Sequence, residues 1–101
     1  MTIAITPTEE VGTYGPVEVG KDRPVTFQVI GTLAGVESID FQVEATYNET
    51  TKVSTWRDMK INDTDVKISA TNDIVTFYGP TYVKAAKSAS AGAVGLRIVN
   101  Q

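Results

Sequence analysis

The sequence predicts an all-β protein, an antiparallel β-sandwich of about eight short strands, and three observations point to this fold class. Of the 101 residues, 35 are Val, Ile or Thr and only two are Leu, which is the preference of pleated strands rather than of helices. Apolar and polar residues alternate with a period of two through most of the chain, as in an antiparallel sheet with one face in water. Turn-forming residues recur at intervals of about 8–12 positions, which is typical of sandwiches and small barrels.

The first 24 residues are the least regular part of this pattern, and we expect them to be an extended arm with edge strands. Ile3 and Ile5 alternate with shorter side chains, Pro7 follows, and glycine and proline recur after it. Proline lacks a backbone donor and is therefore tolerated at the edge of a sheet. The expected edge strands are 2–6 and 17–19.

The rest of the chain carries the regular strand pattern. It is clearest in residues 39–47, where the odd-numbered residues are apolar and the even-numbered ones polar. The odd-numbered side chains, from Ile39 to Tyr47, are therefore expected to face the core. The alternation leaves open whether the sandwich is a jelly roll or immunoglobulin-like. The other expected strands are 25–29, 53–61, 66–70, 74–78, 82–85 and 94–98.

One tryptophan interrupts the alternation of residues 53–61. Val53 and Met59 fall on one face of the strand, whereas Trp56 falls on the other. A β-bulge near residues 54–55 would return Trp56 to the inner face; without it, the ring covers the far side of the sheet. A lone tryptophan in a small domain is usually a core residue, but an exposed one anchors a partner or stacks on a sugar.

The length of the chain limits the number of domains, and the absence of histidine and cysteine limits the kinds of catalytic and metal site that the protein can contain. A chain of 101 residues predicts one domain, residues 1–101. It holds no histidine and no cysteine, so imidazole relays, thiol nucleophiles, thiolate metal sites and disulfides are excluded. The net charge is −3 and the basic residues are scattered, so neither nucleic acid nor a membrane surface is an expected partner. We expect no catalytic residue and no cofactor, and assembly in the cytoplasm.

Three clusters of polar residues are candidates for a metal site, for catalytic acids or for a charged recognition patch. Asp63 and Asp65 alternate as calcium ligands do, but the glycine and distal glutamate of an EF-hand are not in register, so 62–65 is interpreted as a turn, with an ion site as the alternative. The pair 9–10 has no second acid at a defined distance and is interpreted as part of a solvated arm. Residues 21–23 are interpreted as a turn with local ion pairing.

Two tyrosines flank a turn near the end of the chain. Tyr78 and Tyr82 lie on either side of residues 79–81, which contain Gly and Pro. Packing of the rings against the loop is the favoured interpretation, and an exposed aromatic rim is the alternative.

Three groups of short motifs are spread along most of the chain. They are a Thr-Pro-Thr arm (6–8) leading to Gly15–Gly20; Val25–Leu33 followed by Phe41–Val43 and Trp56–Asp58; and Gly79–Ala85 with the terminal Gly92–Arg97. Together these motifs resemble the small β-sandwich virion proteins of tailed bacteriophages.

The resemblance implies a structural role without catalysis. Such proteins include capsid decoration, or cement, proteins, which bind the outside of the head, often as homotrimers, and brace neighbouring subunits of the major capsid protein. Residues 1–7 would add a strand to a neighbour, with Ile3 and Ile5 as anchors. The expected location is the capsid surface of the virion. The candidate interface residues are Ile3, Ile5, Pro7, Trp56, Tyr78 and Tyr82.

Two other classes remain open. One is a fibre- or tail-associated adhesion module that binds a host glycan through loops such as 48–51 and 87–93. The other is a head–tail or tail-tube protein. An exposed aromatic pair on one loop would favour the glycan binder, whereas a buried Trp56 with a wide apolar face on the arm side would favour the decoration protein.

Overall fold

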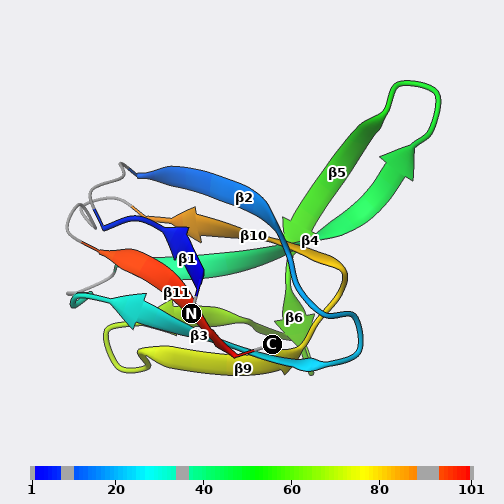
Figure 1. Cartoon of the computed structure of the whole chain (residues 1–101). Helices are drawn as coiled ribbons and strands as arrows, with labels where there is room; N and C mark the ends of the chain where they lie inside the picture. The colour runs from blue at the N-terminus through cyan, green and yellow to red at the C-terminus, as the bar shows by residue number, and fades with distance from the viewer. Residues whose placement is uncertain (1, 8–10, 34–36, 89–93, 101) are drawn as a thin grey trace.

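The described part of this computed structural model, residues 2–7, 11–33, 37–88 and 94–100, contains eleven strands and no helix. It therefore holds no helix of the length and apolarity that a membrane span requires. The strands are β1 (Thr2–Ile5), β2 (Gly12–Glu18), β3 (Pro24–Ile30), β4 (Ser38–Asn48), β5 (Val53–Asp58), β6 (Lys60–Ile61), β7 (Thr64–Asp65), β8 (Lys67–Ser69), β9 (Ile74–Tyr78), β10 (Tyr82–Lys87) and β11 (Gly95–Asn100). The strands form packed antiparallel sheets (Figure 1), which confirms the predicted all-β sandwich.

The order of the strands decides between the two sandwich types that the sequence left open. The first sheet has the order β1-β11-β3-β9, and the second has the order β2-β10-β4-β5, with β8 also paired to β4. Because β5 and β8 pair with successive parts of β4, they act as one interrupted strand. The two sheets then have the strand order of an eight-stranded jelly roll.

Three phenylalanines fill the centre of the sandwich. Phe27 lies on β3, Phe41 on β4 and Phe77 on β9, so both sheets contribute. Their ring centroids are 4.9, 5.5 and 5.7 Å apart, within the range of favourable aromatic pairs. Alternation predicted the inward direction of Phe27 and Phe41 but made no assignment for Phe77. Ile, Val and Leu side chains surround the three rings and complete a filled core.

The N-terminal segment is part of the sandwich. Strand β1 pairs with β11 and β2 pairs with β10 along most of its length, so each lies at the edge of one sheet. The second edge strand is longer than the expected 17–19. Gly95 permits the close approach of β1, because a Cβ at this position would collide with the backbone oxygen of Ile5 and lie 2.9 Å from Pro7 Cδ.

Strand β4 meets two different environments along its length. Ile39 and Phe41 are buried and Val43 packs against the core, as predicted. The expectation that Ala45 and Tyr47 also face the core is wrong, because both are exposed. The reason is that the outer parts of β4 and β5 continue past the end of the sandwich as a projecting hairpin (Figure 1).

A β-bulge occurs in this hairpin, but on the opposite strand from the one considered. Glu44 pairs with Trp56 and Thr46 pairs with Thr55, so Ala45 is the extra residue and residues 54–55 are regular. Because the bulge lies on β4, it does not rotate Trp56 toward the core.

Residues 59–66 leave the edge of β4 and return to the same place. The N–H of Met59 donates to the Phe41 oxygen, the N–H of Phe41 donates to the Val66 oxygen, and the N–H of Val66 donates to the Met59 oxygen. Between these contacts β6 and β7 form a small hairpin whose central residues, Asn62 and Asp63, have φ of 53° and 62°. Two positive φ values are the signature of a type I′ turn, which confirms the predicted turn.

Candidate functional site

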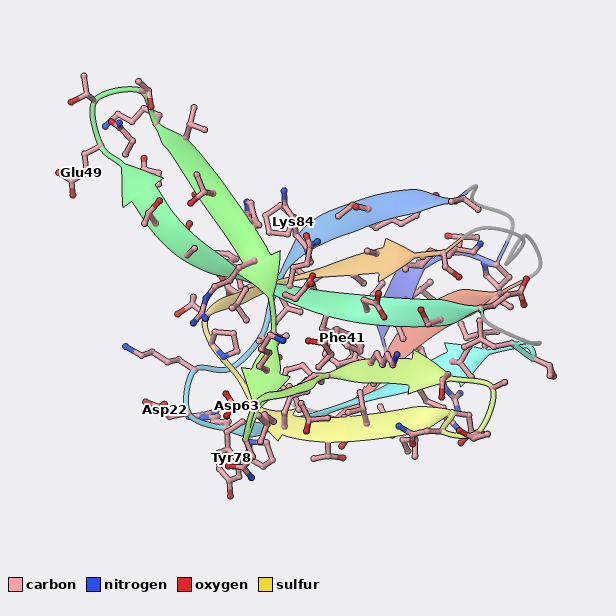
Figure 2. All side chains as sticks on the ribbon, turned by 180° about the vertical axis from the view of Figure 1, so that it is seen from behind. Asp22, Phe41, Glu49, Asp63, Tyr78 and Lys84 are labelled. Atoms are coloured by element: carbon pink, nitrogen blue, oxygen red, sulfur yellow. The ribbon has the colours of Figure 1, made fainter. Side chains whose placement is uncertain are left out.

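The projecting β4–β5 hairpin is the largest feature outside the sandwich. Every residue from 44 to 53 is exposed, and Glu49 lies near its tip (Figure 2). The hydroxyls of Thr46 and Thr55 are hydrogen-bonded across the two strands at 2.6 Å. A two-stranded hairpin without a buried face is only marginally stable in water, so this segment gains stability from any partner that covers it.

The turn at the tip is held by one side chain. The Asn48 Oδ1 accepts the N–H groups of Thr50 and Thr51 at 2.9 and 3.1 Å, and the N–H of Lys52 donates to the Asn48 backbone oxygen at 2.8 Å. Lys52 takes a φ of 61° and returns the chain into β5. Asparagine is suited to this position because its side chain mimics a backbone turn.

Trp56 lies on the outer face of the second sheet, at the base of the hairpin. It is half-buried and is not part of the core cluster. The Lys84 Nζ lies 4.5 Å from the centroid of its ring, a cation–π contact. Lys84 points outward because its neighbours Val83 and Ala85 are buried. The Val-Lys-Ala alternation in β10 indicates an outward-facing lysine at position 84, but Lys84 was not among the predicted site residues.

Exposed apolar side chains gather at the end of the sandwich that carries the projecting hairpin. We call this the hairpin end; it comprises the β4–β5 hairpin, the β6–β7 hairpin and the β9–β10 turn. Figure 2 shows one residue from each, Glu49, Asp63 and Tyr78, at this end. Its exposed apolar residues, with their exposed fractions, are Tyr47 (48%), Val53 (57%), Ile61 (47%), Tyr78 (71%) and Tyr82 (42%).

The two tyrosines form an exposed rim instead of packing against their loop. Tyr78 and Tyr82 flank the turn at residues 79–81, and that turn is fixed from below by backbone bonds. The N–H of Asp22 donates to the Gly79 oxygen and the N–H of Gly79 donates to the Arg23 oxygen, both at 3.0 Å. Residues 21–23 therefore form the predicted turn and support the aromatic rim. The local ion pairing expected for them is not found within the described residues.

The three candidate interface residues near the N-terminus, Ile3, Ile5 and Pro7, are not part of the hairpin end. Ile5 is fully buried in the core of its own chain, so in this arrangement it does not serve as the anchor on a neighbour that the sequence suggested. Ile3 pairs with Arg97 on the outer face of the first sheet and is 48% exposed. Pro7 is half-buried beside Gly95. The structure thus brings Trp56 and the tyrosines to one end, without Ile5.

The charged clusters have structural roles where the structure describes them. The Lys60 Nζ and Asp65 Oδ1 form an ion pair at 3.0 Å across the β6–β7 hairpin, and Asp63 lies in its turn. Within the described ranges, no group of three or more acidic, His or Cys side chains is placed to hold a metal ion. The acids at 9–10 lie outside the described residues.

The second loop considered for glycan binding is only partly described. Lys87 ends β10 and its side chain is buried, so it does not belong to an exposed loop. Residues 89–93 lie outside the described residues. The 48–51 loop, in contrast, is the exposed tip of the projecting hairpin.

A shallow pocket, which the sequence did not indicate, lies at the end of the sandwich away from the hairpin. It has a volume of about 260 Å³ and is lined by residues 29, 31–33 and 69–73, mainly polar groups. This volume is below the roughly 300–1,000 Å³ of typical ligand sites. No aromatic ring lines it, so it offers no surface for stacking on a sugar.

Taken together, the fold and this surface define a class of protein: a jelly-roll β-sandwich with a filled core and an apolar end from which a hairpin projects. Comparison with protein-family models finds no match. Neither the curated proteins nor the solved structures contain a match to the chain. The function is therefore inferred from the fold and from the exposed residues of the hairpin end.

Proposed function

We propose that this chain is a non-enzymatic structural protein of a tailed-bacteriophage virion, a capsid decoration protein. In this role it binds the major capsid protein on the outside of the head and braces neighbouring subunits. The homotrimer is the oligomer that the resemblance implies, and the virion surface is the corresponding location.

The projecting β4–β5 hairpin is the observation that carries this proposal. Its exposed residues, 44–53, contribute nothing to the core of the chain, yet the hairpin carries exposed Tyr47 and Val53. Tyr47 pairs with Ser54 and Val53 pairs with Asn48, so the two apolar side chains lie on opposite faces of the hairpin, and each face offers one apolar contact to a partner. A hairpin that stands out from a rigid sandwich reaches a second subunit while the sandwich remains on the first, which is the geometry that bracing requires.

The interior of the sandwich supports a packing role. Phe27, Phe41 and Phe77 occupy the space between the sheets, so the jelly roll is filled. Jelly rolls also form viral capsid domains. The same fold serves unrelated functions, however, so the fold alone does not select this one.

Cryo-electron microscopy of the source virion, with the chain located by a labelled antibody, tests the proposal. We expect density of a jelly roll on the head, with the hairpin end against the capsid protein. Density confined to the tail would contradict it.

A binding assay with variants isolates the hairpin end. Heads stripped of the chain are incubated with the wild type or with the double variant Tyr47→Ser and Val53→Ser. We expect at least about tenfold weaker binding for the variant, since two exposed apolar contacts are lost. Ile74→Ser is the matched control, because Ile74 is also an exposed apolar residue (44%) but lies on β9.

A glycan-binding adhesion module is the second candidate, and the exposed Tyr78 and Tyr82 favour it. Aromatic rings on either side of one turn present a surface on which sugars stack. Tyr78→Ala and Tyr82→Ala would then abolish binding of the purified chain to host surface glycans and leave head binding unchanged. Loss of head binding with no glycan bound would support the decoration role instead.

A further inference from the structure

One edge of the second sheet is open along the projecting hairpin. β5 pairs with β4 on one side, and no strand in the described part of the chain pairs with its other side. The outer part of this edge stands clear of the sandwich (Figure 1). An open strand edge presents unpaired N–H and C=O groups and is a template for pairing with another chain.

We infer that a second copy of this chain occupies the edge: the β5 strands of two copies pair antiparallel about a two-fold axis, which joins the second sheets of the two copies into one continuous sheet. The register is centred on Thr55, so that Thr55 of one copy lies opposite Thr55 of the other. This inference goes beyond the capsid role. It concerns a two-fold contact between copies, which is distinct from the homotrimer, and it shares Val53 with the proposed capsid contact.

Charge complementarity sets the register. Lys52 lies in the turn directly before β5. With Thr55 at the centre, its long side chain comes level with Asp58 of the other copy, and the two-fold axis produces this opposite-charge contact twice. Neither Lys52 nor Asp58 forms an ion pair within the residues that the structure describes. Cross-strand pairs of opposite charge stabilise a sheet, and like charges destabilise it.

Other registers lose this match. A shift of one residue would place side chains of opposite faces against each other, so the allowed shifts are by two. One such shift brings Asp58 opposite Ser54 and leaves Lys52 beyond the last residue of β5, so the opposite-charge contact is lost. The shift in the other direction brings Lys52 opposite Trp56 and leaves Asp58 opposite Thr50, without a charged partner.

The remaining pairs in the centred register fit by size and polarity. Ser54 lies opposite Trp56 of the other copy, a small residue beside a large one. Val53 lies opposite Arg57, whose aliphatic stem covers the exposed valine. Val53 is 57% exposed in the single chain, so pairing removes apolar surface from water.

Sedimentation velocity of the purified full chain over a range of concentrations tests the inference. We expect a monomer–dimer equilibrium. Lys52→Glu and Asp58→Lys should each weaken the dimer about tenfold or more, since both symmetric contacts become repulsive. The double variant, Lys52→Glu with Asp58→Lys, should restore it. Lys21→Glu makes the same charge change in the exposed β2–β3 turn and should leave the dimer unchanged.

Hydrogen exchange identifies the pairing surface in the same samples. The β5 amides should exchange more slowly at concentrations where the dimer is populated, while those of β9, the open edge of the first sheet, should not. A chain that stays monomeric, a trimer without dimer, or a dimer whose β5 amides exchange as in the monomer would each overturn the inference. Location of the chain on the virion tests the capsid role separately.

Discussion

The two halves of β4 show how one alternating pattern leads to opposite environments. In residues 38–43 the apolar side chains are buried in the sandwich, and Phe41 contacts both other phenylalanines. In residues 44–48 the sequence keeps the same alternation, but the bulge at Ala45 shifts the faces by one residue, and every side chain is exposed. The difference lies in what faces the strand: the first half is covered by the other sheet, and the second half projects beyond it.

This contrast separates two sources of stability. The inner half is stabilised by apolar burial, which couples it to the whole domain. The outer half is held by hydrogen bonds across a hairpin and by the Asn48 side chain, so it can open locally while the sandwich stays folded. Substitutions in the inner half of β4 should therefore lower the free energy of global unfolding, whereas substitutions in the outer half should mainly affect local opening of the hairpin.

The largest effect is expected from Phe41→Ala. Removal of this ring leaves a cavity between Phe27 and Phe77, and such substitutions cost about 3–5 kcal/mol, a large part of the 5–15 kcal/mol that stabilises a typical domain. Chemical denaturation followed by circular dichroism measures the loss. The matched change in the outer half, Tyr47→Ala, should alter the unfolding free energy by less than about 0.5 kcal/mol; equal losses would contradict the separation.

Gly95→Ala should give an intermediate effect. The added Cβ meets the Ile5 oxygen and Pro7, so β1 must move away from β11, at about 1–3 kcal/mol for such overpacking. Hydrogen exchange should show faster exchange of the β1 and β11 amides. Gly20→Ala is the control, since its Cβ would meet only the exposed Arg23 side chain, at 3.1 Å; a similar loss there would refute the steric cause.

Asn48→Ala should act on the hairpin alone. It removes the acceptor of the Thr50 and Thr51 N–H groups, worth about 0.5–1.5 kcal/mol per bond, but the loss falls on local opening of residues 44–55. We expect faster amide exchange in this hairpin and an unchanged midpoint of global unfolding. A drop in the midpoint would show that the hairpin and the sandwich unfold together.

A small effect, larger only than that of Tyr47→Ala, is expected from Lys84→Ala, at the boundary between the two halves. The loss of the cation–π contact with Trp56 should cost about 0.5–1 kcal/mol. Because the chain has one tryptophan, its fluorescence reports this site directly, and emission should shift to longer wavelength as the ring becomes more exposed. Lys67→Ala, which changes an exposed lysine on β8, serves as the control; an unshifted spectrum for Lys84→Ala would contradict the contact.

Alternation predicted most of the fold because a period of two directly encodes which face a side chain occupies. It placed Phe27 and Phe41 on the apolar face of their strands, and both lie in the core. For residues 74–78 it predicted only a strand, and the burial of Phe77 is a finding of the structure. It failed at Ala45 and Tyr47, since the sequence does not encode where the opposing sheet ends. The strand order also lay beyond it, because pairing across the sandwich depends on contacts between distant segments.

The candidate site was less predictable because the position of its side chains depends on contacts between segments that are far apart in the sequence. Tyr78 and Tyr82 were identified from their place beside a turn, but their exposure depends on residues 21–23, far away in the sequence. The position of Trp56 depended on whether a bulge occurred in its own strand or in its partner, and composition does not distinguish these. Ile5 was expected at an interface, whereas the close approach that Gly95 permits puts it in the core.

Residues 59–66, which leave β4, form the β6–β7 hairpin and return to the same place, have a practical consequence for protein engineering. The two ends of this segment, Met59 and Val66, are bonded to each other and to Phe41, so the spacing of the strands does not depend on the length of the chain between them. A peptide inserted between Asn62 and Asp63 would extend from the surface without stretching the sheet. The β6–β7 turn is therefore a suitable place for displaying a foreign sequence on this scaffold.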